Sequence, residues 1–106
     1  HHNKKLDAPS GTAKMLLNSV MDTGDFKPVF GREGVAPRQP KEVGVHALRG
    51  GTIVGEHEVI FAGTDEVLSV KHEAFSKKIF AKGSLVGAEW LIKQKAGLYS
   101  MEDCLF

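Results

Sequence analysis

The middle of the chain contains segments rich in β-branched and aromatic residues, and these constrain the fold more than any other feature. They cover residues 43–48, 53–61 and 67–73. Gly50-Gly51 separates the first two segments, and Gly63-Thr64-Asp65 separates the second from the third. Strand-forming residues bounded by glycine-containing turns are typical of hairpins, so the sequence predicts an antiparallel meander.

Two helices are expected, one on each side of these segments. Ser10 is a favourable N-cap residue, and the apolar residues after it recur at helical spacing. We expect this helix to end near Thr23-Gly24, with Gly24 in a left-handed C-cap conformation. A second helix is expected over residues 76–95. Its inward-facing residues would be Ile79, Phe80, Leu85, Val86 and Trp90.

Prolines and glycines between residues 26 and 40 leave room only for a short strand around Val29 and Phe30. The elements together predict an α+β fold with a mixed, largely antiparallel sheet of about four strands and helices on one face. Apolar residues fall on both faces of the sheet, with Val54 and Ile60 opposite Val59. We therefore expect the other face to be used for oligomerisation, with a second subunit against it.

Composition excludes several classes of protein. A length of 106 residues fits one compact domain. With 14 Lys and Arg against 13 Asp and Glu, the chain is not a generally basic nucleic-acid binder. Its apolar runs are too short to span a membrane, and no secretory leader is expected. Cys104 is the single cysteine, which excludes an internal disulfide framework and favours a cytoplasmic location.

The opening loop is the strongest candidate for chemistry. Ser10-Gly11-Thr12 at a helix start presents unpaired amides, hydroxyl groups and the positive end of the helix dipole. Lys4 and Lys5 precede it, so the segment could receive a carboxylate or a phosphate. The alternative is that Ser10 only caps the helix while the lysines are solvated.

His1 and His2 add titratable groups beside this loop. A neutral imidazole accepts a hydrogen bond, and a charged one donates a proton. From the local sequence alone, the pair could also be the end of a purification tag. No metal site is expected, because no further ligands stand at a suitable spacing.

The remaining polar residues are expected to have structural roles. The histidines on the strand segments should have satisfied partners: His46, His57 and His72. The glutamates there should pair across strands with Lys71 or Arg49: Glu56, Glu58 and Glu73. The glycine-rich segment 31–34 has no strand-to-helix context for a dinucleotide, and no G-x-G-x-x-G pattern occurs.

The first thirteen residues, H-H-N-K-K-L-D-A-P-S-G-T-A, resemble the H-H-x-x-K-x-D-A-P-S-G-T-A signature of the dihydrodipicolinate reductase family of diaminopimelate and lysine biosynthesis. Both histidines belong to that signature, which excludes the tag. The similarity continues through segments 31–34, 49–51, 53–57, 61–63 and 97–101. It covers essentially the whole chain, but only the C-terminal part of the family's protein.

The resemblance implies roles for the residues of the opening loop. His1 corresponds to the family's proposed general acid, and Lys5 to the lysine that helps deliver or stabilise the proton. His2 corresponds to a histidine that contacts substrate. The residues that correspond to the carboxylate-binding group are Ser10, Gly11 and Thr12.

The resemblance also implies an activity and an assembly. The family reduces a cyclic dicarboxylate imine with hydride from NADPH or NADH and usually forms a homotetramer. Residues 1–106 would be its substrate-binding and tetramerisation domain. The Rossmann domain that holds the cofactor would be absent, and the fragment alone inactive. The alternative is an isolated oligomerisation module with a disordered site loop.

Two features qualify the resemblance. Lys77 stands where many members carry arginine, and it loses the bidentate fork, so we leave it out of the site. The tail residues Leu98, Tyr99 and Phe106 would have lost a partner domain. They are expected to be exposed, disordered or packed against another copy.

Overall fold

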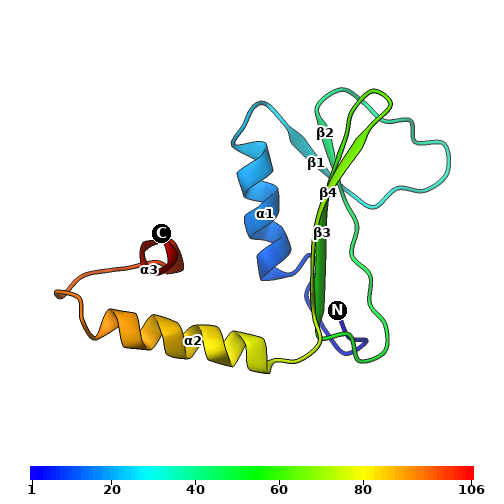
Figure 1. The fold of residues 1–106 in the computed structure, drawn as a ribbon. Coiled ribbons are helices and arrows are strands. Elements are labelled where there is room, and N and C mark those ends of the chain that lie inside the picture. Colours follow the sequence, from blue (N-terminus) through cyan, green and yellow to red (C-terminus); the bar gives the residue numbers. More distant parts are fainter. The chain divides into compact units, whose positions relative to one another are not determined.

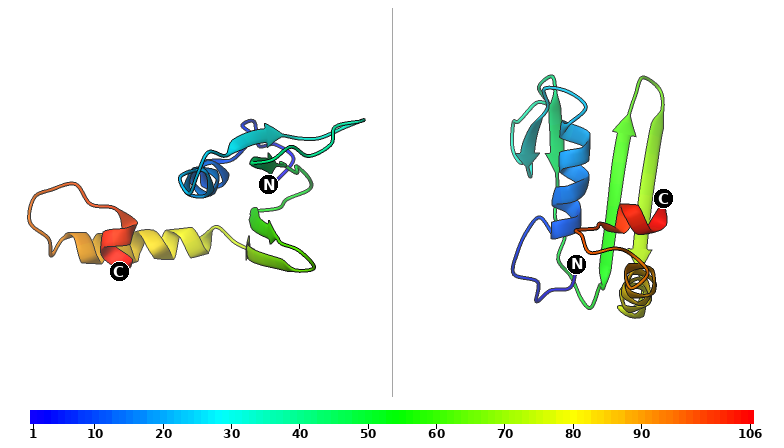
Figure 2. Two further views of the ribbon diagram at one scale, coloured as in Figure 1. Left: turned by 90° about the horizontal axis from the view of Figure 1, so that it is seen from above. Right: turned by 90° about the vertical axis from the view of Figure 1, so that its left-hand side faces the viewer.

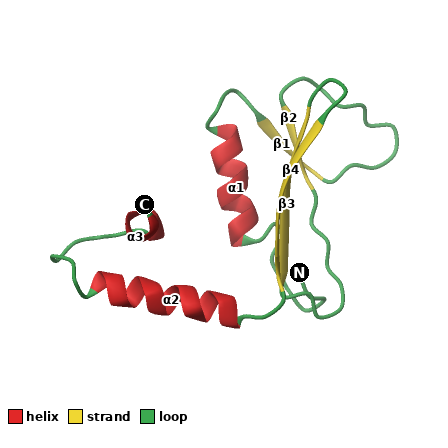
Figure 3. Cartoon of the chain, viewed as in Figure 1, coloured by secondary structure: helices red, strands yellow, loops and turns green.

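The computed structural model describes all 106 residues (Figure 1). The chain forms two compact units, His1–Glu73 and Ala74–Phe106, and each is described by itself. Figure 3 distinguishes the helices and strands. The elements in order are α1 (Gly11–Met21), β1 (Lys27–Phe30), β2 (Glu42–Val45), β3 (Gly55–Ala62), β4 (Val67–Ala74), α2 (Lys78–Leu91) and α3 (Met101–Leu105). The assignment of residues 1–106 to one substrate-binding domain stays a prediction.

Helix α1 begins where the sequence predicts. Ser10 has extended backbone angles, and its hydroxyl oxygen accepts a hydrogen bond from the Ala13 amide at 3.2 Å. The predicted C-terminus was only partly right. The helix ends at Met21 with Asp22 as C-cap, and Gly24 does not adopt positive φ. The Thr23 hydroxyl donates to the Val20 carbonyl at 2.7 Å, so a side chain satisfies that end without a left-handed glycine.

Strands β1 and β2 form a small parallel sheet, with Val29 opposite Gly44. The short strand around Val29 and Phe30 is thereby confirmed. The loop between the strands is held at its base by Arg32, which pairs with Glu42 at 2.6 Å.

Strands β3 and β4 form a hairpin, and their arrows run in opposite directions in Figure 2. Its turn is closed by the Gly63 amide, which donates to the Glu66 carbonyl at 3.0 Å. Lys71 pairs across the strands with Glu56 at 2.9 Å and lies 3.7 Å from Glu73 on its own strand. Cross-strand pairing with Lys71 is therefore confirmed for Glu56, whereas Glu58 forms no ion pair with it.

The strands do not join into the expected sheet of about four strands. They form two sheets of two strands each, and β2 pairs with β1 rather than with β3. The reason lies in the segment between β2 and β3, which bonds to the opening loop instead of turning a hairpin. The Gly50 amide donates to the His1 carbonyl at 3.0 Å, and the Asn3 amide donates to the Gly51 carbonyl at 3.1 Å. The α+β class stands, and use of a sheet face for oligomerisation stays a prediction.

The apolar interior of the first unit is small. Leu17 on α1 is buried, at 9% exposure. An open groove of about 1370 Å³ is lined by apolar and polar residues of several elements, among them α1, β2 and β3. Large apolar side chains of the hairpin, such as Phe61, Leu68 and Val70, remain exposed. This unit therefore presents more apolar surface than a small monomeric domain usually does.

The second unit contains α2 and α3. Helix α2 is shorter than the predicted span of residues 76–95, and none of its residues is buried. Of the expected inward-facing residues, only Trp90 is half-buried. The prediction for Tyr99 was wrong, because its ring is half-buried against Trp90 of the same chain, edge-on with centroids 5.3 Å apart. Leu98 and Phe106 are fully exposed. No helix in the structure has the length and apolar character needed to cross a bilayer.

Candidate functional site

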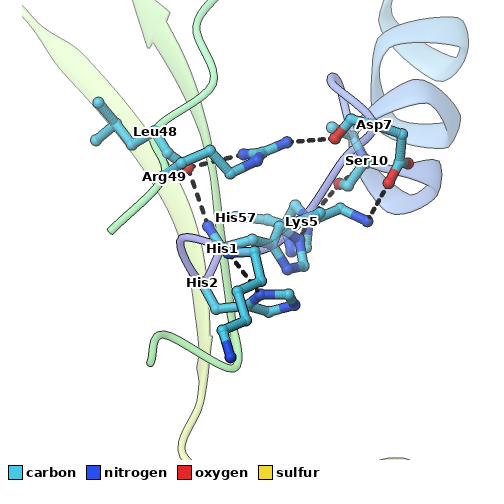
Figure 4. A network of polar contacts seen from close by, with 10 residues as sticks. His1, His2, Lys5, Asp7, Ser10, Leu48, Arg49 and His57 are labelled. Carbon is cyan, nitrogen blue, oxygen red and sulfur yellow. Dashed lines mark hydrogen bonds and ion pairs between the residues drawn. The ribbon is translucent and has the colours of Figure 1, made fainter. Parts of the chain in front are cut away.

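The opening loop is fixed to the segment that precedes β3 (Figure 4). Besides the backbone bonds at Gly50 and Gly51, the Arg49 guanidinium donates to the Asp7 carbonyl at 2.7 Å and to the Leu48 carbonyl at 2.7 Å. The Arg49 Nε atom is buried and has no partner. Arg49 thus fastens the loop and does not pair with the strand glutamates, which corrects the pairing expected for it.

Ser10 lies at the junction of this loop with α1. Ser10 is 6% exposed, yet its hydroxyl group has two partners. Its hydroxyl oxygen takes the Ala13 amide and lies 2.9 Å from Nε2 of His57 on β3. A buried hydroxyl with partners on two elements has a fixed direction, which an adaptable surface serine does not have.

Gly11 and Thr12 form the exposed face of the helix start. Neither of their amides donates to another atom of the chain, and the Thr12 hydroxyl makes no hydrogen bond. A Cβ placed on Gly11 would meet nothing within 4 Å, so the space in front of it is open. Free amides at the positive end of a helix with open space before them suit an anion.

His1 is half-buried between β3 residues. Its Nε2 lies 3.4 Å from Nε2 of His57, and the two rings meet edge-on with centroids 5.2 Å apart. A Cβ on the buried Gly55 would come 3.4 Å from Cε1 of His1. A methyl group at residue 55 would therefore touch the His1 ring, and only a larger side chain would displace it.

His2 and Lys5 occupy the same loop with partners of their own. Nδ1 of His2 accepts from the Lys4 amide at 3.2 Å. The Lys5 ammonium donates to the Asp7 carboxylate at 2.7 Å, and this hydrogen bond holds the pKa of that carboxyl below its usual value. Lys5 is thus oriented by its neighbour in the loop and is not a freely mobile charge.

The electrostatics around His57 favour its neutral form. Burial lowers the pKa of the His57 imidazole below 6.5. The positive charges of the His1 amino group, His72 and Lys5 act in the same direction.

The structure thus connects Ser10 and His1 through His57, with Lys5 and His2 on the same loop and Gly11 and Thr12 at the exposed helix start. Sequence reasoning missed His57 and Gly55 as members of this group. Both stand in segment 53–57, which also carries the family resemblance, and that was the available signal.

The chain offers no group of three or more His, Cys, Asp or Glu side chains placed to hold a metal ion. The glycine-rich segment between β1 and β2 also does not fit the phosphates of a dinucleotide. The glycine-rich segment 31–34 connects β1 to β2, strand to strand, whereas a dinucleotide cradle joins a strand to the N-terminus of a helix.

The chain thus has an α+β fold in which a loop with two histidines leads into an open helix start with free amides. The family described as "Dihydrodipicolinate reductase, C-terminus" matches residues 1–105. The chain belongs to this family, which confirms the resemblance drawn from the sequence.

Relatives named 4-hydroxy-tetrahydrodipicolinate reductase are similar over almost the whole chain. The protein from Exiguobacterium sibiricum is 55% identical over 103 residues, which cover 96% of this chain and 42% of that protein. The protein from Clostridium novyi is 50% identical over 107 residues, which cover 99% of this chain and 42% of that protein. The chain therefore spans well under half the length of these relatives.

Among solved structures, the fold is similar to that of "Dipicolinate bound Dihydrodipicolinate reductase from Paenisporosarcina sp. TG-14". The TM-score is 0.74 at 19% identity, covering 99% of this chain and 42% of that one. At this identity the likeness supports the fold alone.

Proposed function

We propose that residues 1–106 supply the substrate-binding and proton-donating part of a 4-hydroxy-tetrahydrodipicolinate reductase. The substrate would be a cyclic dicarboxylate imine, reduced by hydride from NADPH or NADH. The observation that carries this proposal is the open helix start, whose free Gly11 and Thr12 amides lie in a chain of this family. The Paenisporosarcina reductase is described as dipicolinate-bound, and dipicolinate is a ligand of the same chemical class.

Binding would begin at the helix start. One carboxylate of the ligand would accept hydrogen bonds from the Gly11 and Thr12 amides and from the Thr12 hydroxyl. Hydrogen bonds to a charged acceptor are about twice as strong as neutral ones, and the helix dipole adds to them. The Ser10 side chain is buried at this end of the helix, where it caps α1 and would hold the helix start in place.

The reaction also needs a proton. Hydride addition to the carbon of a C=N bond forms a C–H bond and moves the electron pair to nitrogen, which then takes a proton. His1 is our candidate donor because its half-buried ring lies in the same group of residues. Lys5 would stabilise the negative charge that hydride addition leaves on the substrate nitrogen. The ion pair with Asp7 keeps the Lys5 ammonium oriented.

The nicotinamide cofactor would supply the hydride, and we expect residues outside 1–106 to hold most of it. This agrees with the poor fit of segment 31–34 to a dinucleotide. The chain alone is therefore expected to bind a dicarboxylate and to turn over no substrate.

The test is a calorimetric titration with pyridine-2,6-dicarboxylate. Thr12→Val removes a hydroxyl proposed to contact the carboxylate, and we expect it to weaken binding about tenfold, the worth of one hydrogen bond to a charged group. Thr23→Val is the matched control, because the Thr23 hydroxyl caps the other end of α1. Equal affinities for the two variants, or no binding by the wild-type protein, would contradict the proposal.

The alternative function is oligomerisation without a working site. The exposed apolar side chains of the hairpin, Phe61, Leu68 and Val70, favour a second copy of this chain as their cover. We propose a homotetramer, as usual for the family. A tetramer that binds no dicarboxylate would favour the oligomerisation module over the reductase domain.

A further inference from the structure

His57 on β3 is the best-connected side chain that the proposed chemistry does not use. Its Nε2 atom lies 2.9 Å from the Ser10 hydroxyl oxygen and 3.4 Å from Nε2 of His1. Ser10 precedes the free amides of the helix start, and His1 is the candidate proton donor. One nitrogen atom therefore contacts both parts of the site.

The direction of the hydrogen bond between Ser10 and His57 depends on which of the two atoms carries the hydrogen. The Ser10 oxygen already accepts from the Ala13 amide, and its hydroxyl has one hydrogen to give. When His57 is neutral with its proton on Nδ1, its Nε2 lone pair takes that hydrogen. When Nε2 is protonated, it donates to Ser10 instead, and the hydroxyl hydrogen is free to turn toward a ligand.

The surroundings favour the first state in the unliganded chain. Burial lowers the pKa of His57, and so do the positive charges of the His1 amino group, His72 on β4 and Lys5 on the loop. The imidazole of His1 is the titratable group that faces the same nitrogen. A dianion at the helix start reverses this balance, since it places negative charge nearby and offers an acceptor for the released hydrogen.

We propose that His57 is a positioning residue that sets the direction of the Ser10 hydroxyl, so that dicarboxylate binding is coupled to uptake of a proton at His57. This rests on the proposed function, because it places a carboxylate at the start of α1. Coupling makes the affinity highest at low pH. The affinity then falls as the pH rises from the lowered pKa of the free imidazole to the higher pKa in the complex.

The test uses the intact polypeptide that carries this sequence and pyridine-2,6-dicarboxylate as ligand. Calorimetry in two buffers of different ionisation enthalpy measures the protons taken up on binding. In the coupled window, the dissociation constant of the wild-type protein should rise by up to about tenfold per pH unit. His57→Gln keeps an acceptor for the Ser10 hydroxyl, but the glutamine does not titrate. The part of the proton uptake that comes from His57 should therefore disappear.

His46→Gln is the matched control. It removes an imidazole that is exposed, makes no hydrogen bond to Ser10 and is not among the groups that shift the pKa of His57. The control should retain the uptake of the wild-type protein. If His57→Gln takes up as many protons as His46→Gln, the coupling is wrong.

A second measurement separates this proposal from the proposed function. If no variant binds the dicarboxylate, the proposed function fails together with the coupling. The hydrogen bond itself is still decided by the imidazole nitrogen NMR spectrum of His57 without ligand. Ser10→Ala should shift the Nε2 signal and move the neutral tautomer toward Nε2–H. An identical spectrum in Ser10→Ala would overturn the positioning role.

Discussion

Ser10 has two roles that depend on one oxygen atom. It ends the extended loop by capping α1 through the Ala13 amide, and it links that helix to His57 on β3. Its exposure of 6% means that water cannot replace either partner. The stability of the helix start and the geometry of the candidate site therefore depend on the same atom.

Replacing Ser10 by alanine should lower the free energy of unfolding by about 1–2 kcal/mol, because N-cap serines contribute about that much. Ser19→Ala is the control within the same helix. Its hydroxyl donates to the Met15 carbonyl on the exposed face, so its loss should change stability by no more than about 0.5 kcal/mol. Urea unfolding of both variants measures the difference. Equal decreases in the free energy of unfolding would show that the Ser10 cap does not stabilise the helix.

The contacts of Ser10 also show which interactions can be predicted from the sequence. The role of Ser10 as a cap was predictable because its partner, the Ala13 amide, is three residues away. The contact between Ser10 and His57 joins residues 47 positions apart, and no local pattern indicates it. The sequence therefore indicates only a structural role for His57, whereas the structure places it against both Ser10 and His1. The assignment of catalytic roles to His1 and Lys5 came from the family resemblance and stays a prediction.

At the scale of elements, the sequence predicted strands better than their pairing. The span of β4 was predicted to within one residue, because β-branched residues and the turn at Gly63 mark it locally. The pairing of β2 depends instead on what the glycine pair after it does. Gly50-Gly51 has the composition of a hairpin turn, but its backbone groups bond to His1 and Asn3. The pairing of β2 with β3 is lost because the opening loop, distant in sequence, takes those groups, whereas the hairpin of β3 and β4 forms as predicted.

A substitution at Gly51 tests how the opening loop is held, because the backbone of this residue bonds to that loop. Gly51 has φ of 49°, where a side chain is strained even though a Cβ would meet nothing within 4 Å. Gly51→Ala should therefore destabilise the chain by about 1 kcal/mol through backbone strain alone. Gly50→Ala is the matched control, since that residue has equal space and no positive φ.

Thermal unfolding of the two glycine variants gives the comparison directly. Gly50→Ala is expected to be neutral or slightly stabilising, because alanine restricts the unfolded chain. The histidine NMR signals should also show that His1 becomes more mobile only in Gly51→Ala, because residue 51 accepts the Asn3 amide beside it. A neutral Gly51→Ala would mean that the turn is free to adopt another conformation.

At the scale of the whole molecule, the apolar surface is the feature that most needs an explanation. Alternation along β4 places Leu68 and Val70 on one face of the hairpin and Ser69 and Lys71 on the other. Leu68 is 63% exposed and Val70 is 61% exposed. Burying a side chain of this size contributes about 1.5–3 kcal/mol, so such a face gains stability when another surface covers it.

If a second copy provides that cover, a charge on the apolar face should disturb assembly and the same charge on the opposite face should not. Val70→Asp is expected to lower the molar mass measured by light scattering at micromolar concentration, because an unpaired carboxylate would be buried in the contact. Ser69→Asp, one residue away on the polar face, should keep the wild-type mass. Circular dichroism must show that both variants retain their secondary structure. A monomeric wild-type protein, or equal molar masses for the two variants, would contradict assembly through this face. The apolar face of the hairpin would then be covered by another part of the same polypeptide.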